Sequence, residues 1–192
     1  MRLRRRNRVK KIILISAKAH SGKDYCADYI AEQLKAKGYT VVRDMFAKYI
    51  KGYLRDYYGW DGITKDDFYR DTLQQMGTED IKEDLNYKCF HAKRLCEDFN
   101  IVEKHFDFFI VSDTRFKDEI YIMKAMFPDK VLTIRINRID IDVKEDLGEL
   151  SQHKSELDLD DFDFDINIEN DGTDYIKSEL NLIIKLGIIG DN

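Results

Sequence analysis

The sequence has no long apolar run, and this absence excludes one class of protein at once. The apolar stretches 12–15 and 106–112 each hold fewer than ten residues, whereas a helix that crosses a bilayer needs about 18. The basic segment 1–11 precedes an apolar stretch that is too short for a secretory signal, and no small-residue cleavage pattern follows it. We therefore expect a cytoplasmic protein without a membrane-spanning helix.

Cysteine is scarce and irregularly placed. Cys26, Cys89 and Cys96 are odd in number and form no Cys-x-x-Cys pair, which suits a reducing compartment. We expect free, mostly buried thiols. Cys89, His91 and Cys96 could be drawn as a metal cluster, but the spacing of these two cysteines is that of a helical core and no fourth ligand is placed. We therefore favour core positions over a zinc site.

Proline occurs once, at Pro128, and no Pro/Gly/Ser-rich tract or internal repeat divides the chain. A length of 192 residues is typical of one domain. With 43% hydrophobic residues, 11 Phe and 11 Tyr, the chain can bury a core, which excludes a disordered or low-complexity protein. We expect a single folded domain over 11–192.

Charge is unevenly distributed along the chain. The first eleven residues carry a charge of +7, and the remainder carries 25 basic against 37 acidic residues, or −12. We expect 1–10 to form a basic flexible arm. Such an arm could touch nucleic acid, but it is more often a solvated tail, and the acidic remainder argues against a nucleic-acid-binding face elsewhere.

Apolar periodicity predicts alternating strands and helices, and hence a doubly wound, five-stranded parallel sheet with helices on both faces. Strands are expected over 8–15, 39–43, 105–112, 131–136 and 164–168, and helices over 23–37, 117–127 and 173–186. The helical pattern of 46–100 predicts an inserted all-helical region. Residues 137–163 are charged and nearly without pattern, so we treat them as a lid.

The strongest motif lies between the first strand and the first helix, and it reads Ala17-Lys18-Ala19-His20-Ser21-Gly22-Lys23-Asp24. A phosphate loop requires this context, because the N–H groups at a helix N-terminus point at phosphate oxygens while a lysine bridges them. Ala17 stands where a glycine is expected, and because alanine tolerates positive φ poorly we expect a strained or slightly open loop there. Asp24 replaces the usual Ser or Thr but could still reach magnesium. The alternative is an ordinary strand-to-helix turn.

A second motif ends the buried strand that precedes Asp113. An apolar strand that ends in an acid brings a carboxylate beside magnesium in such folds, so we assign Asp113 to the metal. Arg115 follows at the carboxyl end of the same strand, where its fork of donors suits a phosphate. The alternatives are a turn aspartate and a surface salt bridge.

These motifs resemble those of the phage-type deoxynucleoside monophosphate kinases, P-loop kinases that are also similar to animal-type phosphomevalonate kinase. The resemblance covers about residues 10–185. The matching segments are Lys18-Ala19-His20-Ser21-Gly22-Lys23-Asp24, Phe46-Ala47, Lys51, Gly59-Trp60-Asp61-Gly62, Lys65, Arg70, Leu73-Gln74, Gly77-Thr78, Val111-Ser112-Asp113-Thr114-Arg115-Phe116, His153-Lys154-Ser155-Glu156 and Asn167-Ile168-Glu169-Asn170-Asp171-Gly172. Departures are His20 for arginine, Tyr49 for proline, Lys82 for arginine and Phe90 for tryptophan.

The resemblance implies a P-loop nucleoside monophosphate kinase-like fold with a helical acceptor-binding region and a lid. It also implies roles for single residues. The ATP-binding set is Ala17, Lys18, Ala19, His20, Ser21, Gly22, Lys23, Asp24, Tyr25 and Asn170, the last at the adenine edge. The acceptor-binding set is Lys51, Arg70, Gln74 and Arg115, and the magnesium-binding set is Asp24 and Asp113. Two arginines flank the start of the lid: we expect Arg138 to close onto the transferring phosphoryl group and Arg135 to point to solvent.

We therefore expect ATP- and Mg²⁺-dependent transfer of a phosphoryl group to a (deoxy)nucleoside monophosphate, with Lys23, Arg115 and Arg138 as catalytic residues. No general base is required, since a phosphate oxygen is already a nucleophile. A nucleotide acceptor should find a stacking surface, for which Tyr57, Trp60 and Tyr69 are available, although aromatic residues at helical spacing are more often core. The alternatives are a phosphomevalonate-like acceptor and a nucleotide-binding regulator with little turnover; a homodimer is also left open.

Overall fold

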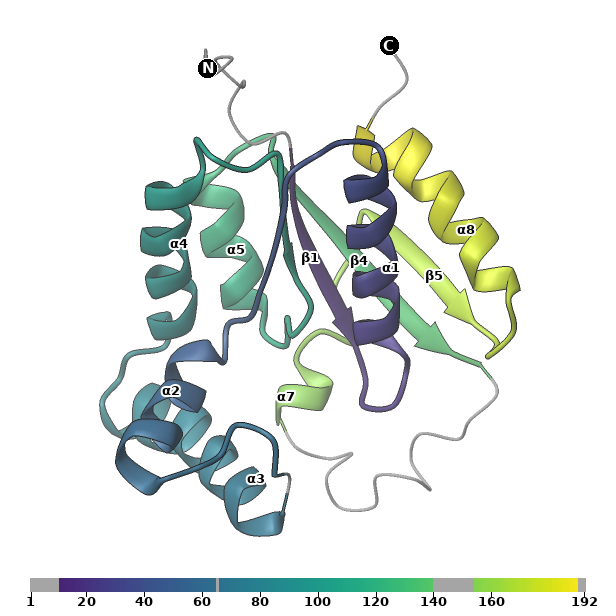
Figure 1. Cartoon of the computed structure of the whole chain (residues 1–192). Coiled ribbons are helices and arrows are strands. Elements are labelled where there is room, and N and C mark those ends of the chain that lie inside the picture. Colours follow the sequence, from purple (N-terminus) through teal and green to yellow (C-terminus); the bar gives the residue numbers. More distant parts are fainter. Residues whose placement is uncertain (1–10, 65, 140–153, 190–192) are drawn as a thin grey trace.

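The computed structural model describes residues 11–64, 66–139 and 154–189. Its centre is a five-stranded sheet in the order β2-β3-β1-β4-β5, in which every pair of neighbouring strands is parallel. Helices cover both faces of the sheet (Figure 1). The predicted fold class is confirmed.

The first strand–helix–strand unit follows the predicted pattern closely. Strand β1 (Lys11–Ala17) leads through the loop 18–22 into helix α1 (Lys23–Ala36), and β2 (Val41–Asp44) follows. Residues 12–15 of β1 are all fully buried, as expected of a central parallel strand that is covered on both faces. Gly38 adopts the left-handed φ of 85° and ends the first helix, as its position predicts.

The remaining elements alternate in the same way after a helical stretch. They are α2 (Lys48–Tyr58), α3 (Asp67–Gln74), the π-helical segment η1 (Gln75–Asp84), α4 (Phe90–Val102), β3 (Phe108–Val111), α5 (Lys117–Met126), β4 (Val131–Arg138), α7 (Lys154–Leu157), β5 (Ile166–Asn170), α8 (Tyr175–Ile183) and η3 (Ile184–Ile189).

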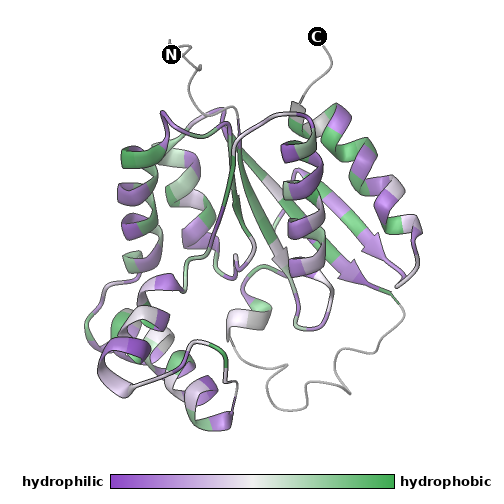
Figure 2. Ribbon diagram, in the orientation of Figure 1, coloured by the Kyte–Doolittle hydropathy of each residue, from purple (hydrophilic) through white to green (hydrophobic). Residues whose placement is uncertain are grey.

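Two apolar clusters hold the helices on the sheet. One cluster joins α1 and α8 to one face, and the other joins α4 and α5 to the opposite face. In the second cluster the ring of Phe99 packs edge-on against Phe109 and Phe127, with centroid distances of 4.8 and 4.6 Å. Figure 2 shows the matching pattern, in which the strands are mostly apolar at the centre while the helices carry polar residues on their outer surfaces.

The predicted insertion over 46–100 is helical, but it does not form one unit. Helix α4 buries Ala92, Leu95, Cys96 and Phe99 in the core, so it belongs to the helical layer on the sheet. Only α2, α3 and η1 form a separate lobe, which lies beyond the carboxyl ends of the strands in Figure 1. Helical periodicity alone does not distinguish these cases, because it shows that one helix face is apolar and not what covers it.

The lid over 137–163 stays a prediction, but regular secondary structure occupies both ends of this range. Strand β4 continues to Arg138, and 154–157 form the short helix α7. Leu159 and Phe164 are then buried in the second apolar cluster. The rest of the predicted lid, 140–153, and the predicted arm, 1–10, lie outside the described residues.

No helix in the described parts of the chain has both the length and the apolar character needed to cross a bilayer.

The cysteines are free, as predicted, and differ in exposure. Cys26 and Cys96 are buried, whereas Cys89 is partly exposed. Burial raises the pKa of Cys26 and of Cys96 to about 11. A raised pKa leaves little thiolate near neutral pH, and the thiolate is the nucleophile.

We therefore predict that iodoacetamide at pH 8 modifies Cys89 in the folded protein well before Cys26 or Cys96. Peptide mass spectrometry over a time course measures the order, and the same reaction in denaturant, where all three thiols should react alike, is the control. Modification of Cys26 as fast as Cys89 in the native protein would contradict the described packing.

Candidate active site

The loop between β1 and α1 has the geometry of an anion-binding turn. The Ser21 N–H donates to the Lys18 carbonyl at 3.3 Å, and His20 and Gly22 both have left-handed φ angles, of 61° and 82°. These angles turn the chain so that α1 begins at Lys23, directly beyond the carboxyl end of β1. The N–H groups of a first helical turn have no partners inside the helix and are available to an anion such as phosphate.

The strain that we expected at Ala17 is absent from that residue. Ala17 is still part of β1 and is in register with Ile136 of β4, so its backbone is extended. The left-handed positions of the loop are instead His20 and Gly22. An alanine is accommodated at position 17 because the chain turns only after it.

Asn170, at the end of β5, supports the loop from behind. Its side-chain amide donates to the Ser21 carbonyl at 3.0 Å, and its Oδ1 accepts from the Gly172 N–H at 3.0 Å. The side chain is 5% exposed. Both ends of the amide are thus engaged within the protein, which gives Asn170 a supporting position behind the loop, and its predicted contact with adenine stays a prediction.

Asp24 presents an exposed carboxylate in the first turn of α1. Its side chain is 69% exposed, and its Oδ2 lies 4.0 Å from the Lys23 ammonium. The Ser112 hydroxyl donates to the other oxygen, Oδ1, at 3.1 Å. Magnesium commonly binds one or two carboxylates together with substrate phosphates. An exposed carboxylate such as that of Asp24 is a donor of this kind. The described residues include no group of three or more His, Cys, Asp or Glu that could hold a metal by itself.

Asp113 has a different environment from the one that we predicted. Its carboxylate accepts the Phe46 N–H at 2.8 Å and the Ala47 N–H at 3.0 Å, at the start of α2. Burial raises the pKa of Asp113, against these two hydrogen bonds and the charges of Lys51 and Arg115, which lower it. Both oxygens are engaged by the helical lobe, and the residue of this strand end that contacts Asp24 is the preceding serine.

The structure brings part of the predicted acceptor-binding set together. Lys51 and Arg115 both lie close enough to Asp113 to influence its ionisation, and Arg115 also donates to the Ser155 hydroxyl of α7 at 3.2 Å. Arg70 does not join this group, since its side chain is 61% exposed and lies 3.9 Å from Asp67 on the same helix. Gln74 is the last residue of α3, in the helical lobe.

The two arginines of β4 differ from each other in burial. We expected Arg135 to point to solvent, but it is 9% exposed and donates to the Ser16 hydroxyl at 2.8 Å. It also lies 3.0 Å from Asp160, whose other oxygen lies 2.8 Å from the Lys18 ammonium. Asp160 therefore ties the loop 18–22 to β4. Arg138 ends β4 in register with Asn170, at the same edge of the sheet as the loop.

Tyr25, also assigned to ATP, lies on α1 with about half of its surface exposed. Its ring stacks against Tyr29 of the same helix, with a centroid distance of 6.5 Å. The structure thus leaves this side chain accessible beside the loop.

Sequence reasoning missed three residues that shape this site: Arg43, Ser112 and Asp160. Arg43 and Ser112 each end a predicted strand, and the carboxyl edge of a parallel sheet is where ligands bind, so a signal existed for both. Asp160 lies within an acidic stretch of the predicted lid, where no pattern separated it from its neighbours.

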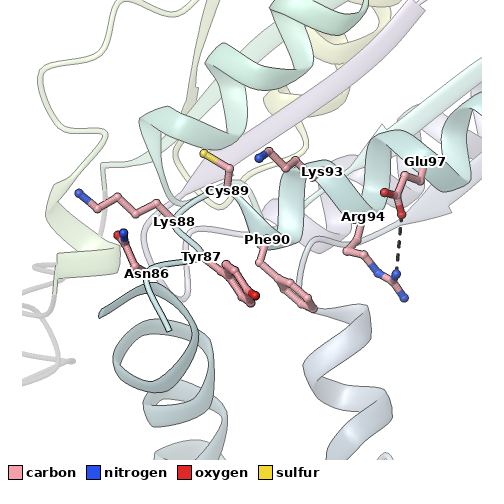
Figure 3. Close-up of a pocket in the computed structure, with 8 residues that line it drawn as sticks. All are labelled: Asn86, Tyr87, Lys88, Cys89, Phe90, Lys93, Arg94 and Glu97. Carbon is pink, nitrogen blue, oxygen red and sulfur yellow. Dashed lines mark ion pairs between the residues drawn. The ribbon is translucent and has the colours of Figure 1, made fainter. Parts of the chain in front are cut away.

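A hollow of about 390 Å³ lies elsewhere, around the start of α4 (Figure 3). Its lining residues are Asn86, Tyr87, Lys88, Cys89, Phe90, Lys93, Arg94 and Glu97. Another, of about 310 Å³, lies between the edge strand β2 and α4. Neither is lined by a residue that we assigned to ATP, metal or acceptor.

Comparison with known proteins supports the fold. No protein-family model matches the sequence, and no curated protein does. Among solved structures, the chain is similar to APS kinase CysC of Mycobacterium tuberculosis in complex with AMPPNP and APS, at 11% identity over 93% of this chain and 97% of that chain, with a TM-score of 0.56. It is also similar to a sugar kinase from Janibacter sp., at 13% identity over 95% and 99% of the two chains, with a TM-score of 0.50. The chain thus has the fold of the P-loop kinases, while the phage-type family stays a prediction.

The contact between Gly22 and Asn170 gives a prediction for stability. A Cβ at position 22 would lie 2.6 Å from Asn170 Nδ2, at a backbone φ of 82°. We predict that Gly22→Ala lowers the free energy of unfolding by about 1–3 kcal/mol more than Gly38→Ala does. Gly38 is the matched control because its φ is 85° and a Cβ there would have nothing within 4 Å. Urea denaturation measures both variants.

A double mutant separates the destabilisation caused by the clash with Asn170 from that caused by backbone strain at position 22. Because Asn170→Ala removes the clashing amide, Gly22→Ala should cost less in that background than in the wild type. Equal costs in the two backgrounds would show that the two residues do not touch.

Proposed function

We propose that this protein is a phosphotransferase that moves the γ-phosphoryl group of ATP to the phosphate of a small molecule, most specifically a (deoxy)nucleoside monophosphate. The observation that carries the proposal is the loop 18–22, which opens α1 at the carboxyl end of β1 with Lys23 and Asp24 in its first turn. The fold that this chain shares with an AMPPNP-bound kinase supports the proposal of ATP as the phosphoryl donor.

On the donor side, the loop N–H groups and the Lys23 ammonium would bind the ATP phosphates, with Asn170 holding the loop backbone in place. Asp24 would hold the magnesium ion, which neutralises charge on the phosphate oxygens. We assign Asp113 a supporting role in this proposal, because its two N–H partners belong to the helical lobe.

On the acceptor side, Lys51 and Arg115 supply the positive charge that a phosphate dianion requires. The Asp113 carboxylate lies close to both and joins the start of α2 to the end of β3. Arg70 and Gln74, on α3, would complete the set when the lobe and the sheet approach one another, as helical lobes of kinases do on substrate binding. Arg138 would neutralise charge on the transferring group. These residues orient oxygens and offset charge, and none has to accept a proton.

A non-nucleotide phosphorylated acceptor is the second candidate, and one observation favours it. Trp60 is 8% exposed, packs against Tyr69 at a centroid distance of 6.0 Å, and donates its indole N–H to the Thr64 carbonyl. This ring is therefore occupied within the lobe and offers no stacking face to a base. Tyr57 is 80% exposed and stays available.

The test is ADP release with ATP and Mg²⁺, screened across the four deoxynucleoside monophosphates, the ribonucleoside monophosphates and phosphomevalonate. We predict turnover with at least one nucleoside monophosphate, and a loss in kcat/KM of about 100-fold or more for Lys23→Ala, since the ammonium is needed where charge develops. Lys35→Ala, which removes a lysine from the last turn of the same helix, is the control and should leave the rate unchanged.

The outcomes separate the candidates. Turnover on phosphomevalonate alone would keep the chemistry and replace the acceptor class. A Lys23→Ala variant with wild-type turnover would contradict the mechanism, and silence on every acceptor, with ATP still bound, would favour a nucleotide-binding regulator.

A further inference from the structure

Three elements meet through side chains behind the exposed carboxylate of Asp24. Arg43 on β2 donates from NH2 to the Ser112 hydroxyl at 3.0 Å, and that hydroxyl donates to Asp24 Oδ1 at 3.1 Å. A hydroxyl can accept one hydrogen bond while it donates another, so the serine passes the polarisation of the guanidinium to the carboxylate. This series of hydrogen bonds connects β2, the residue after β3 and the first turn of α1.

Arg43 also acts on Asp24 directly. Its NH2 lies 3.9 Å from Asp24 Oδ1, and its NH1 donates to Asp28, one turn further along α1. The side chain of Arg43 is 25% exposed, against 69% for Asp24. The fixed partner is therefore the arginine, and the carboxylate that it holds faces solvent.

Holding the Arg43 guanidinium in this position lowers the stability of the folded protein. Within the described part of the chain, Arg43 Nε is buried and has no hydrogen-bond partner. Leaving a buried donor unsatisfied is destabilising. A solvated surface salt bridge would not require this, which indicates that the position of the guanidinium is maintained for the contacts made by its two terminal nitrogens.

The two oxygens of Asp24 consequently differ. Oδ1 is engaged by Ser112 and lies near Arg43, while Oδ2 lies on the side of Lys23, at 4.0 Å. Contacts within the protein thus orient the carboxylate, with one oxygen engaged by Ser112 and Arg43. Outer contacts of this kind fix the orientation of groups that bind metals.

We propose that Arg43 and Ser112 are positioning residues that orient the Asp24 carboxylate toward the magnesium ion of the bound nucleotide. The proposal rests on the proposed function, since it assumes a metal–nucleotide complex at the loop. It assigns a role in that site to the edge strand β2, which lies two strands away from β1 in the sheet.

The experiment measures the affinity for the non-hydrolysable nucleotide AMPPNP by calorimetry, once with Mg²⁺ and once with EDTA, on the full chain. We expect Arg43→Gln and Ser112→Ala each to weaken binding about 10-fold in Mg²⁺ and to leave binding in EDTA within about twofold, which is close to the measurement's resolution. Because Arg43 and Ser112 act through the same series of hydrogen bonds, the double variant should lose little more affinity than either single variant.

Asp28→Asn is the matched control, because it removes the other ion-pair partner of Arg43 and leaves the contacts with Ser112 and Asp24. It should keep the affinity in Mg²⁺ unchanged. Thermal melting of each variant verifies that it is folded, and the wild-type affinity tests the proposed function separately.

Two results for the variants would overturn the proposal. Equal weakening in Mg²⁺ and in EDTA would show that Arg43 supports only the fold of the loop, and no weakening in either would show that Asp24 needs no positioning. A wild-type protein that binds no AMPPNP in either condition would refute the proposed function, and the positioning role with it.

Discussion

The parallel pairing of β1 with both β3 and β4 is the constraint from which the site follows. Strands that run in the same direction end at the same edge, so the loop after Ala17, the Ser112–Asp113 pair and Arg138 are all delivered to one place. The middle of β1 is buried on both faces and its backbone is paired on both sides. The chain can therefore turn and present unpaired N–H groups only beyond this edge.

Carboxylates offset the repulsion between the cations at this edge of the sheet. Asp113 lies near Lys51 and Arg115, and Asp160 lies between Lys18 and Arg135. Without these acids, several positive charges would repel one another across a short distance in a partly desolvated site. With the acids in place, a phosphate-bearing ligand would meet cations whose positions are already fixed. This is the condition for electrostatic stabilisation without reorganisation of the site.

The sequence was sufficient for the strand and helix order and for the turn that opens α1, because these depend on local patterns. Buried parallel strands are continuous apolar runs, and Gly22-Lys23 before an amphipathic helix is a local signal. It was insufficient wherever partners lie far apart in the chain. The sequence placed Asp113 at a strand end but did not predict its hydrogen-bond partners. These partners are the N–H groups of residues 46–47, which lie far from Asp113 in the sequence. Arg135 was misplaced because Asp160, its partner, lay in a stretch without periodicity, and α4 was misplaced because its apolar face does not reveal what covers it.

The hydrogen bond from Asn170 to the Ser21 carbonyl joins residues separated by 149 positions. A ribosome would therefore release the loop long before it makes the strand that braces it. Contacts so distant in sequence form late, because a large loop of chain must close first. The N-terminal segment and the last strand thus mature together: the turn that opens α1 reaches its final support only when β5 has added to the edge of the sheet. The final form of the loop 18–22 therefore depends on the arrival of the last strand of the sheet.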